Sequence, residues 1–179
     1  MQKVLMIIAM LVLSACSSKP EGIEPVQNFN LDKYLGTWYE IARLDHSFER
    51  GMSHVTATYA LRDDGKVSVL NKGFSEQDHQ WFEAEGVAQF VSEPNIGHLK
   101  VSFFRPFYGA YVVFALDEKD YQYALVAGPN RDYLWLLARN PELSHAIRAD
   151  LVHQAKELGF DTSELIFVEH HGDVIASKE

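Results

Sequence analysis

The stretch GTWYEIA at residues 36–42 opens the region that decides the fold, because short runs of alternating apolar and polar residues continue from it. Alternation with a period of two is typical of strands that bury one face. Turn residues such as Asp63-Asp64-Gly65 and Pro129-Asn130 separate several of the runs. We therefore expect eight strands, at about residues 38–46, 53–62, 66–74, 81–91, 98–104, 110–117, 121–128 and 132–139.

The order of these runs predicts an all-β fold, an eight-stranded up-and-down antiparallel barrel. Short loops join consecutive strands, closure removes both exposed edges, and eight strands leave an interior that holds one small ligand. One helix should follow, with Asn140 as its N-cap, Pro141 in its first turn and Gly159 at its end. Its single apolar stripe must pack on the outside of the barrel.

Composition excludes some classes of protein. The chain has 179 residues, enough for one domain, and a net charge of −9 with no basic run, which argues against nucleic-acid binding. Eight histidines are scattered without metal-ligand spacing, and no nucleophile elbow or phosphate-binding loop is present. We expect no metal, no cofactor and no enzymatic activity.

The single cysteine, Cys16, follows a basic start, an apolar run and two small residues, as a secretory signal requires. Leu-Ser-Ala-Cys resembles the lipobox of bacterial lipoproteins, in which the cysteine receives the lipid. The alternative is a secreted protein with an unused thiol. The expected organisation is a signal peptide at 1–15, a lipidated N-terminus and polar tether at 16–29, the barrel domain with its helix at 30–170 and a tail at 171–179.

Two motifs at opposite ends of the barrel carry a family resemblance. GTWYEIA resembles the Gly-x-Trp signature on the first strand of lipocalins, and YLWLLAR at 133–139 resembles their last strand. The likeness spans residues 29–170 and is greatest to bacterial outer-membrane lipocalins, with a more distant likeness to apolipoprotein D. The resemblance implies that Arg139 packs over Trp38 at a closed end, where a guanidinium stacked on an indole stabilises the fold.

Strand parity predicts the lining of the barrel, because alternate residues face inward. With Trp38 and Arg139 as inward markers, the expected lining is apolar, with Asn71, Tyr111 and Tyr133 as polar groups near the rim. A filled core is the alternative, and a bulge would shift the parity by one residue. The expected ligand-binding residues are Val55, Ala57, Tyr59, Val67, Val69, Asn71, Phe90, Val101, Phe103, Tyr111, Val113, Val126, Tyr133 and Trp135.

The segment 104–111 between the fifth and sixth strands is rich in aromatic residues, which an exposed loop usually avoids. It is interpreted as a lid, a membrane contact, a surface for a homodimer whose mouths share a ligand, or a loop folded over the end of the barrel.

The family resemblance implies a carrier of fatty acids or lysophospholipids, held by its acyl anchor on the periplasmic face of the outer membrane and serving envelope maintenance. One rival is a lipid-modifying enzyme on the same barrel, for which Glu40 is the inward titratable group. The other rival is a structural lipoprotein with a filled barrel.

Overall fold

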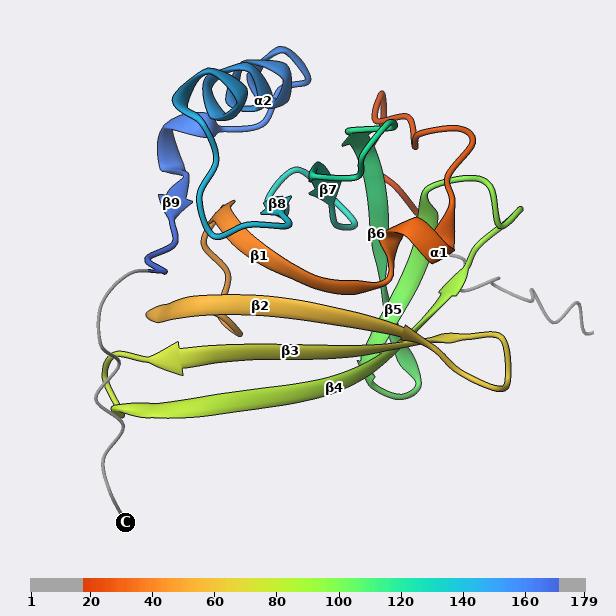
Figure 1. The fold of residues 1–179 in the computed structure, drawn as a ribbon, viewed down its shortest axis with the longest axis horizontal. Coiled ribbons are helices and arrows are strands. Elements are labelled where there is room, and N and C mark those ends of the chain that lie inside the picture. Colours follow the sequence, from red (N-terminus) through yellow and green to blue (C-terminus); the bar gives the residue numbers. More distant parts are fainter. Residues whose placement is uncertain (1–17, 171–179) are drawn as a thin grey trace, which may run out of the picture.

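The structure is a computed structural model that describes residues 18–170. It is mostly strands, as expected, with one long helix near the C-terminus (Figure 1). The elements in chain order are α1 (Leu31–Tyr34), β1 (Gly36–Arg43), β2 (Met52–Leu61), β3 (Val67–Ser75), β4 (Gln80–Phe90), β5 (His98–Phe104), β6 (Phe107–Leu116), β7 (Tyr123–Ala127), β8 (Leu134–Ala138), α2 (His145–Glu157), a 3₁₀ turn (Thr162–Glu164) and β9 (Ile166–Phe167).

The first eight strands form a closed antiparallel barrel in up-and-down order, which confirms the predicted fold class. Each strand pairs with the next, and β1 closes the ring by pairing with β8 on one side and with β2 on the other. The pairing of β1 with β2 covers residues 36–39, and β9 pairs with β1 at Ala42 and Arg43. The ninth strand therefore lies outside the barrel, next to the end of β1.

Strand β1 contains an irregularity that changes which side chains face inward. Its register with β8 shifts between Glu40 and Ala42, so that Ile41 is an extra residue in β1. Trp38 and Glu40 face the interior before the shift. After it, Ala42 belongs to the outer core, whereas the Arg43 side chain hydrogen-bonds to Glu40.

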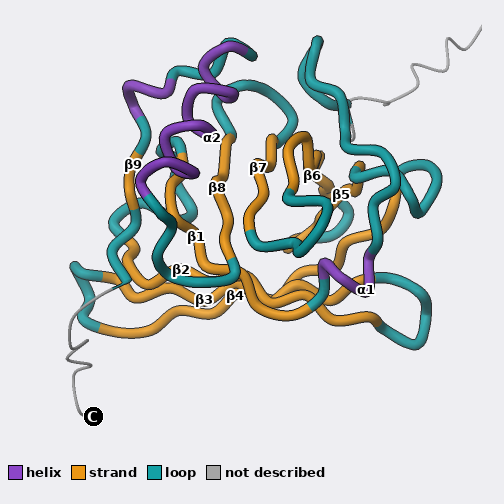
Figure 2. The backbone as a smooth tube through the Cα atoms, turned by 45° about the horizontal axis from the view of Figure 1, so that its top comes forward, coloured by secondary structure: helices purple, strands orange, loops and turns teal. Residues whose placement is uncertain are grey.

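Two apolar cores lie on the two sides of the barrel wall. The outer core joins the wall of β1, β6, β7 and β8 to α2, and Leu151 and Ala155 of the helix are buried in it. Figure 2 shows α2 beside β1 and β8, on the outside of the barrel. The inner core closes one end of the barrel, around Trp38, Tyr34 and Phe29. Space for a ligand therefore remains only toward the other end, which we call the mouth.

The N-terminal segment differs from the expected free tether. From Pro20 onward it packs along the barrel: Ile23 is fully buried in the outer core, and Val26 exchanges backbone hydrogen bonds with Val113 and Gly97. Apolar side chains at intervals in a Pro- and Gly-containing segment account for this packing. We call residues 20–30 the N-terminal strap. The signal peptide, Cys16 and the tail 171–179 lie outside the described residues.

Two boundaries also differ from the prediction. The N-cap of α2 is Ser144, whose side chain accepts a hydrogen bond from the Ile147 N–H, so the cap lies four residues after the expected Asn140. Gly159 does follow the helix, with a φ of +84° that favours glycine. Strand β6 begins at Phe107, which makes the aromatic segment a tight hairpin rather than a long loop.

Candidate functional site

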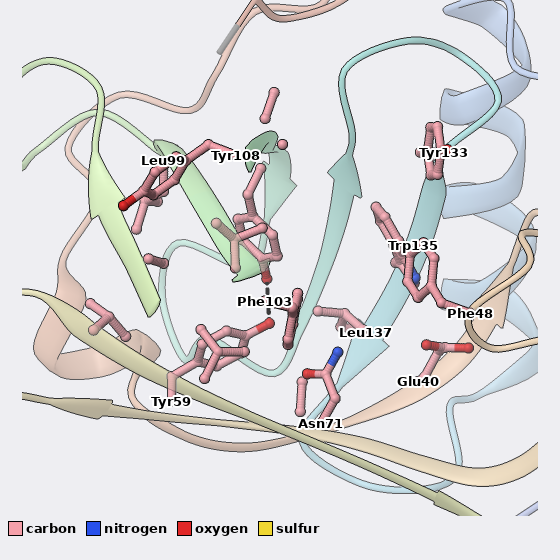
Figure 3. Close-up of a pocket in the computed structure, with 18 of the residues that line it drawn as sticks. Glu40, Phe48, Tyr59, Asn71, Leu99, Phe103, Tyr108, Tyr133, Trp135 and Leu137 are labelled. Atoms are coloured by element: carbon pink, nitrogen blue, oxygen red, sulfur yellow. Dashed lines mark hydrogen bonds between the residues drawn. The ribbon is translucent and has the colours of Figure 1, made fainter. Parts of the chain in front are cut away.

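A cavity of about 370 Å³ lies inside the barrel (Figure 3). Its volume is within the range of small-molecule sites, and its walls are mainly aliphatic and aromatic. Strands β2, β3, β5, β6 and β8 supply most of the lining. Eleven of the expected ligand-binding residues line it: Val55, Ala57, Tyr59, Val67, Val69, Asn71, Val101, Phe103, Tyr111, Tyr133 and Trp135.

Three residues expected to contact a ligand do not line the cavity. Val113 and Val126 are fully buried in the inner core, and Phe90 packs against it with its ring 6.1 Å from that of Phe29. All three face inward, as parity predicts. They lie where the N-terminal strap and α1 fill the barrel, so this end is solid.

Arg139 and Trp38 hold the closed end together. The guanidinium carbon lies 4.0 Å from the centre of the indole ring. Arg139 also donates hydrogen bonds to the carbonyl oxygens of Lys33 and Leu35 at 2.7 and 2.9 Å, and the Trp38 Nε1–H donates to the Tyr34 carbonyl at 2.8 Å. These bonds fix α1 across the end of the barrel and thereby place Tyr34 under the cavity.

Three tyrosine hydroxyls form a chain at the closed end of the cavity. The Tyr111 hydroxyl lies 2.7 Å from that of Tyr34 and 2.8 Å from that of Tyr59. Tyr111 was expected near the rim; instead it pairs across the sheet with Leu99, close to the start of β5. Burial raises the pKa of all three phenols, so each hydroxyl keeps its proton.

A buried cluster of charged side chains lies at the end of β1 and in the turn that follows it. Arg43 donates to Glu40 at 2.7 Å and to the Glu49 carbonyl at 2.7 Å. Glu49 in turn contacts His46 at 3.0 Å and accepts a hydrogen bond from the Trp135 indole at 3.1 Å. Of this cluster, Glu40, Glu49 and Trp135 line the cavity (Figure 3 labels Glu40 and Trp135).

The two carboxyl groups of this cluster have opposite electrostatic environments. Burial raises the pKa of Glu40 well above its ordinary value, the nearby Glu49 raises it further, and Arg43 opposes both. Burial also acts to raise the pKa of Glu49, but contacts with His46 and Trp135 and the charge of Arg43 hold it below its ordinary value. The negative charge of the pair is therefore best stabilised on Glu49.

Aromatic side chains surround the mouth. Phe48 stacks on His46 with ring centres 4.0 Å apart, and Tyr133 lies 6.1 Å from Trp135. The hairpin of β5 and β6 presents Phe104 and Phe107, which are 82% and 72% exposed. Because Phe104 is so exposed, the aromatic segment is not simply folded over the end of the barrel.

Several residues of the site were not predicted from the sequence. Tyr34 and Phe29 lie before the first predicted strand, although their apolar spacing after Ile23 was a signal that this segment packs on the barrel. Arg43 and Glu49 became inward groups only because of the extra residue in β1 and the turn that follows it. Asn71 lines the cavity with its Oδ1 buried and without a hydrogen-bond partner among residues 18–170.

The described part of the chain shows neither a cluster of metal-binding side chains nor a helix that could span a membrane. No group of three or more His, Cys, Asp or Glu side chains there is placed to hold a metal ion. Within the same residues, no helix is both long and apolar enough to cross a bilayer.

The chain is similar to known proteins over most of its length. The family model described as a lipocalin-like domain matches residues 29–170. The outer membrane lipoprotein Blc of Vibrio cholerae is 53% identical over 169 residues, covering 94% of this chain and 99% of that protein. The protein of the same name from Escherichia coli K12 is 51% identical and covers 92% of this chain and 93% of its own. Bovine apolipoprotein D is 38% identical over 66% of each chain.

Solved structures with low identity share the fold. Insecticyanin from the tobacco hornworm Manduca sexta superposes with a TM-score of 0.67 at 21% identity, covering 89% of each chain. The cockroach allergen Per a 4 gives a TM-score of 0.66 at 19% identity, covering 86% of this chain and 95% of that one.

Proposed function

The chain belongs to the lipocalin family, and from that premise we propose that it is an outer-membrane carrier that stores or transports fatty acids or lysophospholipids. The family is one of binding and carrier proteins rather than enzymes. Localisation in the outer membrane follows from the Blc relatives, which are named for it. The ligand class, the site of anchoring and the role in envelope maintenance are parts of the proposal.

The observation that carries the proposal is the hollow, apolar middle of the barrel. Each buried methylene contributes about 0.8 kcal/mol, so burying about ten of them contributes about 8 kcal/mol. That free energy corresponds to a micromolar complex before ordering costs are subtracted. A filled structural barrel would leave no cavity of about 370 Å³, so the cavity favours the carrier over that rival.

The proposed anchor is the acylated Cys16, which would hold the barrel on the periplasmic face of the outer membrane. Two acyl signals are enough for stable attachment to a bilayer. The N-terminal strap supports this arrangement, because the chain is firmly packed from Pro20 onward and only a short stretch remains between the barrel and Cys16. A carrier so placed would meet free acyl chains where membrane lipids are degraded.

The proposed assembly is a homodimer formed through the aromatic hairpin. Phe104 and Phe107 are largely exposed at the mouth, where two copies would bury them against one another. Such an arrangement would place two cavities mouth to mouth.

Native mass spectrometry of a soluble form beginning after Cys16, with and without 1-palmitoyl lysophosphatidylethanolamine or hexadecanoic acid, tests the carrier proposal. We expect a mass increase of one intact ligand per barrel. No bound ligand at tens of micromolar would contradict the carrier, and release of a hydrolysed or isomerised lipid would favour the enzyme rival.

A further inference from the structure

We propose that the tyrosine chain is a subsite for the carboxyl group of a free fatty acid, which therefore binds with its carboxyl group at the closed end and its methyl end at the mouth. This inference rests on the proposed carrier function and adds the direction in which one ligand class binds. A lysophospholipid would bind the opposite way, because its phosphate head group is too large and too polar for the closed end.

The first argument is the position of the hydroxyls. Tyr34, Tyr59 and Tyr111 all line the cavity, and all three belong to the part of the barrel that Trp38 closes. The Tyr34 ring lies 4.7 Å from the indole of Trp38 and 5.5 Å from the ring of Tyr59. Figure 3 shows the Tyr59 hydroxyl pointing into the cavity, with its hydrogen bond dashed.

The second argument is a count of protons. Three hydroxyl groups carry three protons, and the two contacts through Tyr111 use two of them. No other acceptor within residues 18–170 hydrogen-bonds to these oxygens. One donor is thus left facing an apolar cavity, and an unpaired buried donor costs about 1–3 kcal/mol. A carboxyl oxygen of the ligand would accept that proton.

The third argument is the position of the Arg139 cation. Its guanidinium stacks on Trp38, and its charge opposes the rise in pKa that burial causes at both Tyr34 and Tyr59. Glu40 and Glu49, the acids that line the cavity, further raise the pKa of Tyr59 but are not among the charges that shift the pKa of Tyr34. A ligand carboxyl group would therefore be best placed at the Tyr34 end of the tyrosine chain, where the charge of Arg139 acts and the charges of the two acids do not.

Bromine-labelled ligands test the direction of binding, because bromine quenches indole fluorescence at short range. Trp38 reports the closed end and Trp135 reports the mouth, whereas Trp81 is exposed and is removed by W81F. In W81F/W135F, which retains Trp38, 2-bromohexadecanoic acid should quench at least about twice as strongly as 16-bromohexadecanoic acid. W81F retains both Trp38 and Trp135. In this variant the part of the quenching that comes from Trp135 should be larger with 16-bromohexadecanoic acid than with 2-bromohexadecanoic acid.

The opposite order at both tryptophans would overturn the inference while leaving the carrier proposal intact, since the acid would still be bound. Absence of quenching by either acid, together with absence of bound lipid in the mass spectrum, would overturn both. Equal quenching by the two acids at Trp38 would also overturn the inference, because it would mean that the ligand has no preferred direction.

Removing a hydroxyl provides a second measurement. Y111F should weaken hexadecanoic acid binding about tenfold, the effect of losing a hydrogen bond to a charged group. The loss of affinity for 1-palmitoyl lysophosphatidylethanolamine should be several-fold smaller. Y123F, a tyrosine on the outer core, is the matched control. Equal losses of affinity for the two ligands would contradict the inference. If Y111F does not fold, the quenching by the two brominated acids still tests the direction of binding, because that experiment keeps all three tyrosines.

Discussion

The guanidinium of Arg139 stacks on the indole of Trp38 and donates hydrogen bonds to four backbone carbonyl oxygens, those of Lys33, Leu35, Thr37 and Tyr121. One side chain from the end of the last barrel strand thus joins α1, the start of β1 and the turn before β7. This makes Arg139 a structural residue whose loss would open the closed end.

R139A should lower the free energy of unfolding by about 2–4 kcal/mol, because it removes the cation–π contact and leaves several carbonyl groups without donors. Urea unfolding followed by tryptophan fluorescence measures this loss. R62A is the control, because Arg62 forms only an exposed pair with Asp64 and should cost about 0.5 kcal/mol or less. Similar losses in the two variants would contradict the role of Arg139.

E40Q should change the pH dependence of stability. The folded-state pKa of Glu40 is raised above its ordinary value of 4.5, so the folded state holds this proton more tightly than the unfolded state. Wild-type stability should therefore fall, relative to E40Q, as the pH rises above about 4.5, with a slope of at most about 1.4 kcal/mol per pH unit.

Urea unfolding of both proteins from pH 4 to pH 8 measures the difference. Glu49, whose folded pKa is lowered, contributes the opposite trend below about pH 4.5, so the effect of Glu40 is taken from the data above that pH. A difference between them that stays constant over the whole range would show that Glu40 is not perturbed.

A57W should fill the cavity and abolish lipid binding. Ala57 lines the cavity, so an indole there occupies the space that an acyl chain needs. T58W is the matched control, since Thr58 is the next residue of β2 and its hydroxyl bonds Thr37 on the outer face. Displacement of a fluorescent fatty acid should give a loss of at least about a hundredfold for A57W and little change for T58W. Retained binding by A57W would place the ligand elsewhere.

I23A should destabilise the fold by about 2–4 kcal/mol, because it leaves a void in the outer core under the N-terminal strap. I166A, at a residue that is 38% exposed, should cost clearly less. Thermal or urea unfolding compares them. If I23A were neutral, the strap would contribute little to the barrel in solution.

F104S/F107S should shift the proposed dimer to monomer with little loss of stability, because both rings are largely exposed. Sedimentation velocity at micromolar concentration measures the change. F82S, at an exposed phenylalanine on β4, is the control and should leave the oligomeric state as it is. A wild-type protein that sediments as a monomer at all concentrations would contradict the dimer.

Much of the fold could be predicted from the sequence, because alternation and turn residues determine strands locally. The eight strands are of this kind, whereas the stacking of Arg139 on Trp38 was expected from the resemblance to lipocalins. Most of the cavity lining followed from parity alone. Parity identifies which face a residue is on, however, and not how deep it lies, so Val113, Val126 and Phe90 were misplaced as ligand contacts and Tyr111 was placed at the rim.

The remaining features depend on contacts that are distant in sequence. Tyr34 reaches the cavity because Arg139, 105 positions later, holds α1 by its carbonyl groups. The N-terminal strap is buried because Ile23 joins the outer core, which brings together residues from β1, β6, β7, β8 and α2 that are far apart in the sequence. The start of α2 depended on whether Asn140 or Ser144 supplies the cap, and both are good capping residues.

The extra residue at Ile41 has a consequence for the interior of the molecule. If the residues of β1 alternated strictly, Glu40 would face inward and Arg43 would face outward, toward the apolar face of α2. The unpaired Ile41 lets Glu40 and Arg43, which are three positions apart, face the same side of the strand, so that the buried carboxyl group keeps its counter-ion. One additional amino acid in a single strand thus allows the barrel wall to hold an ion pair.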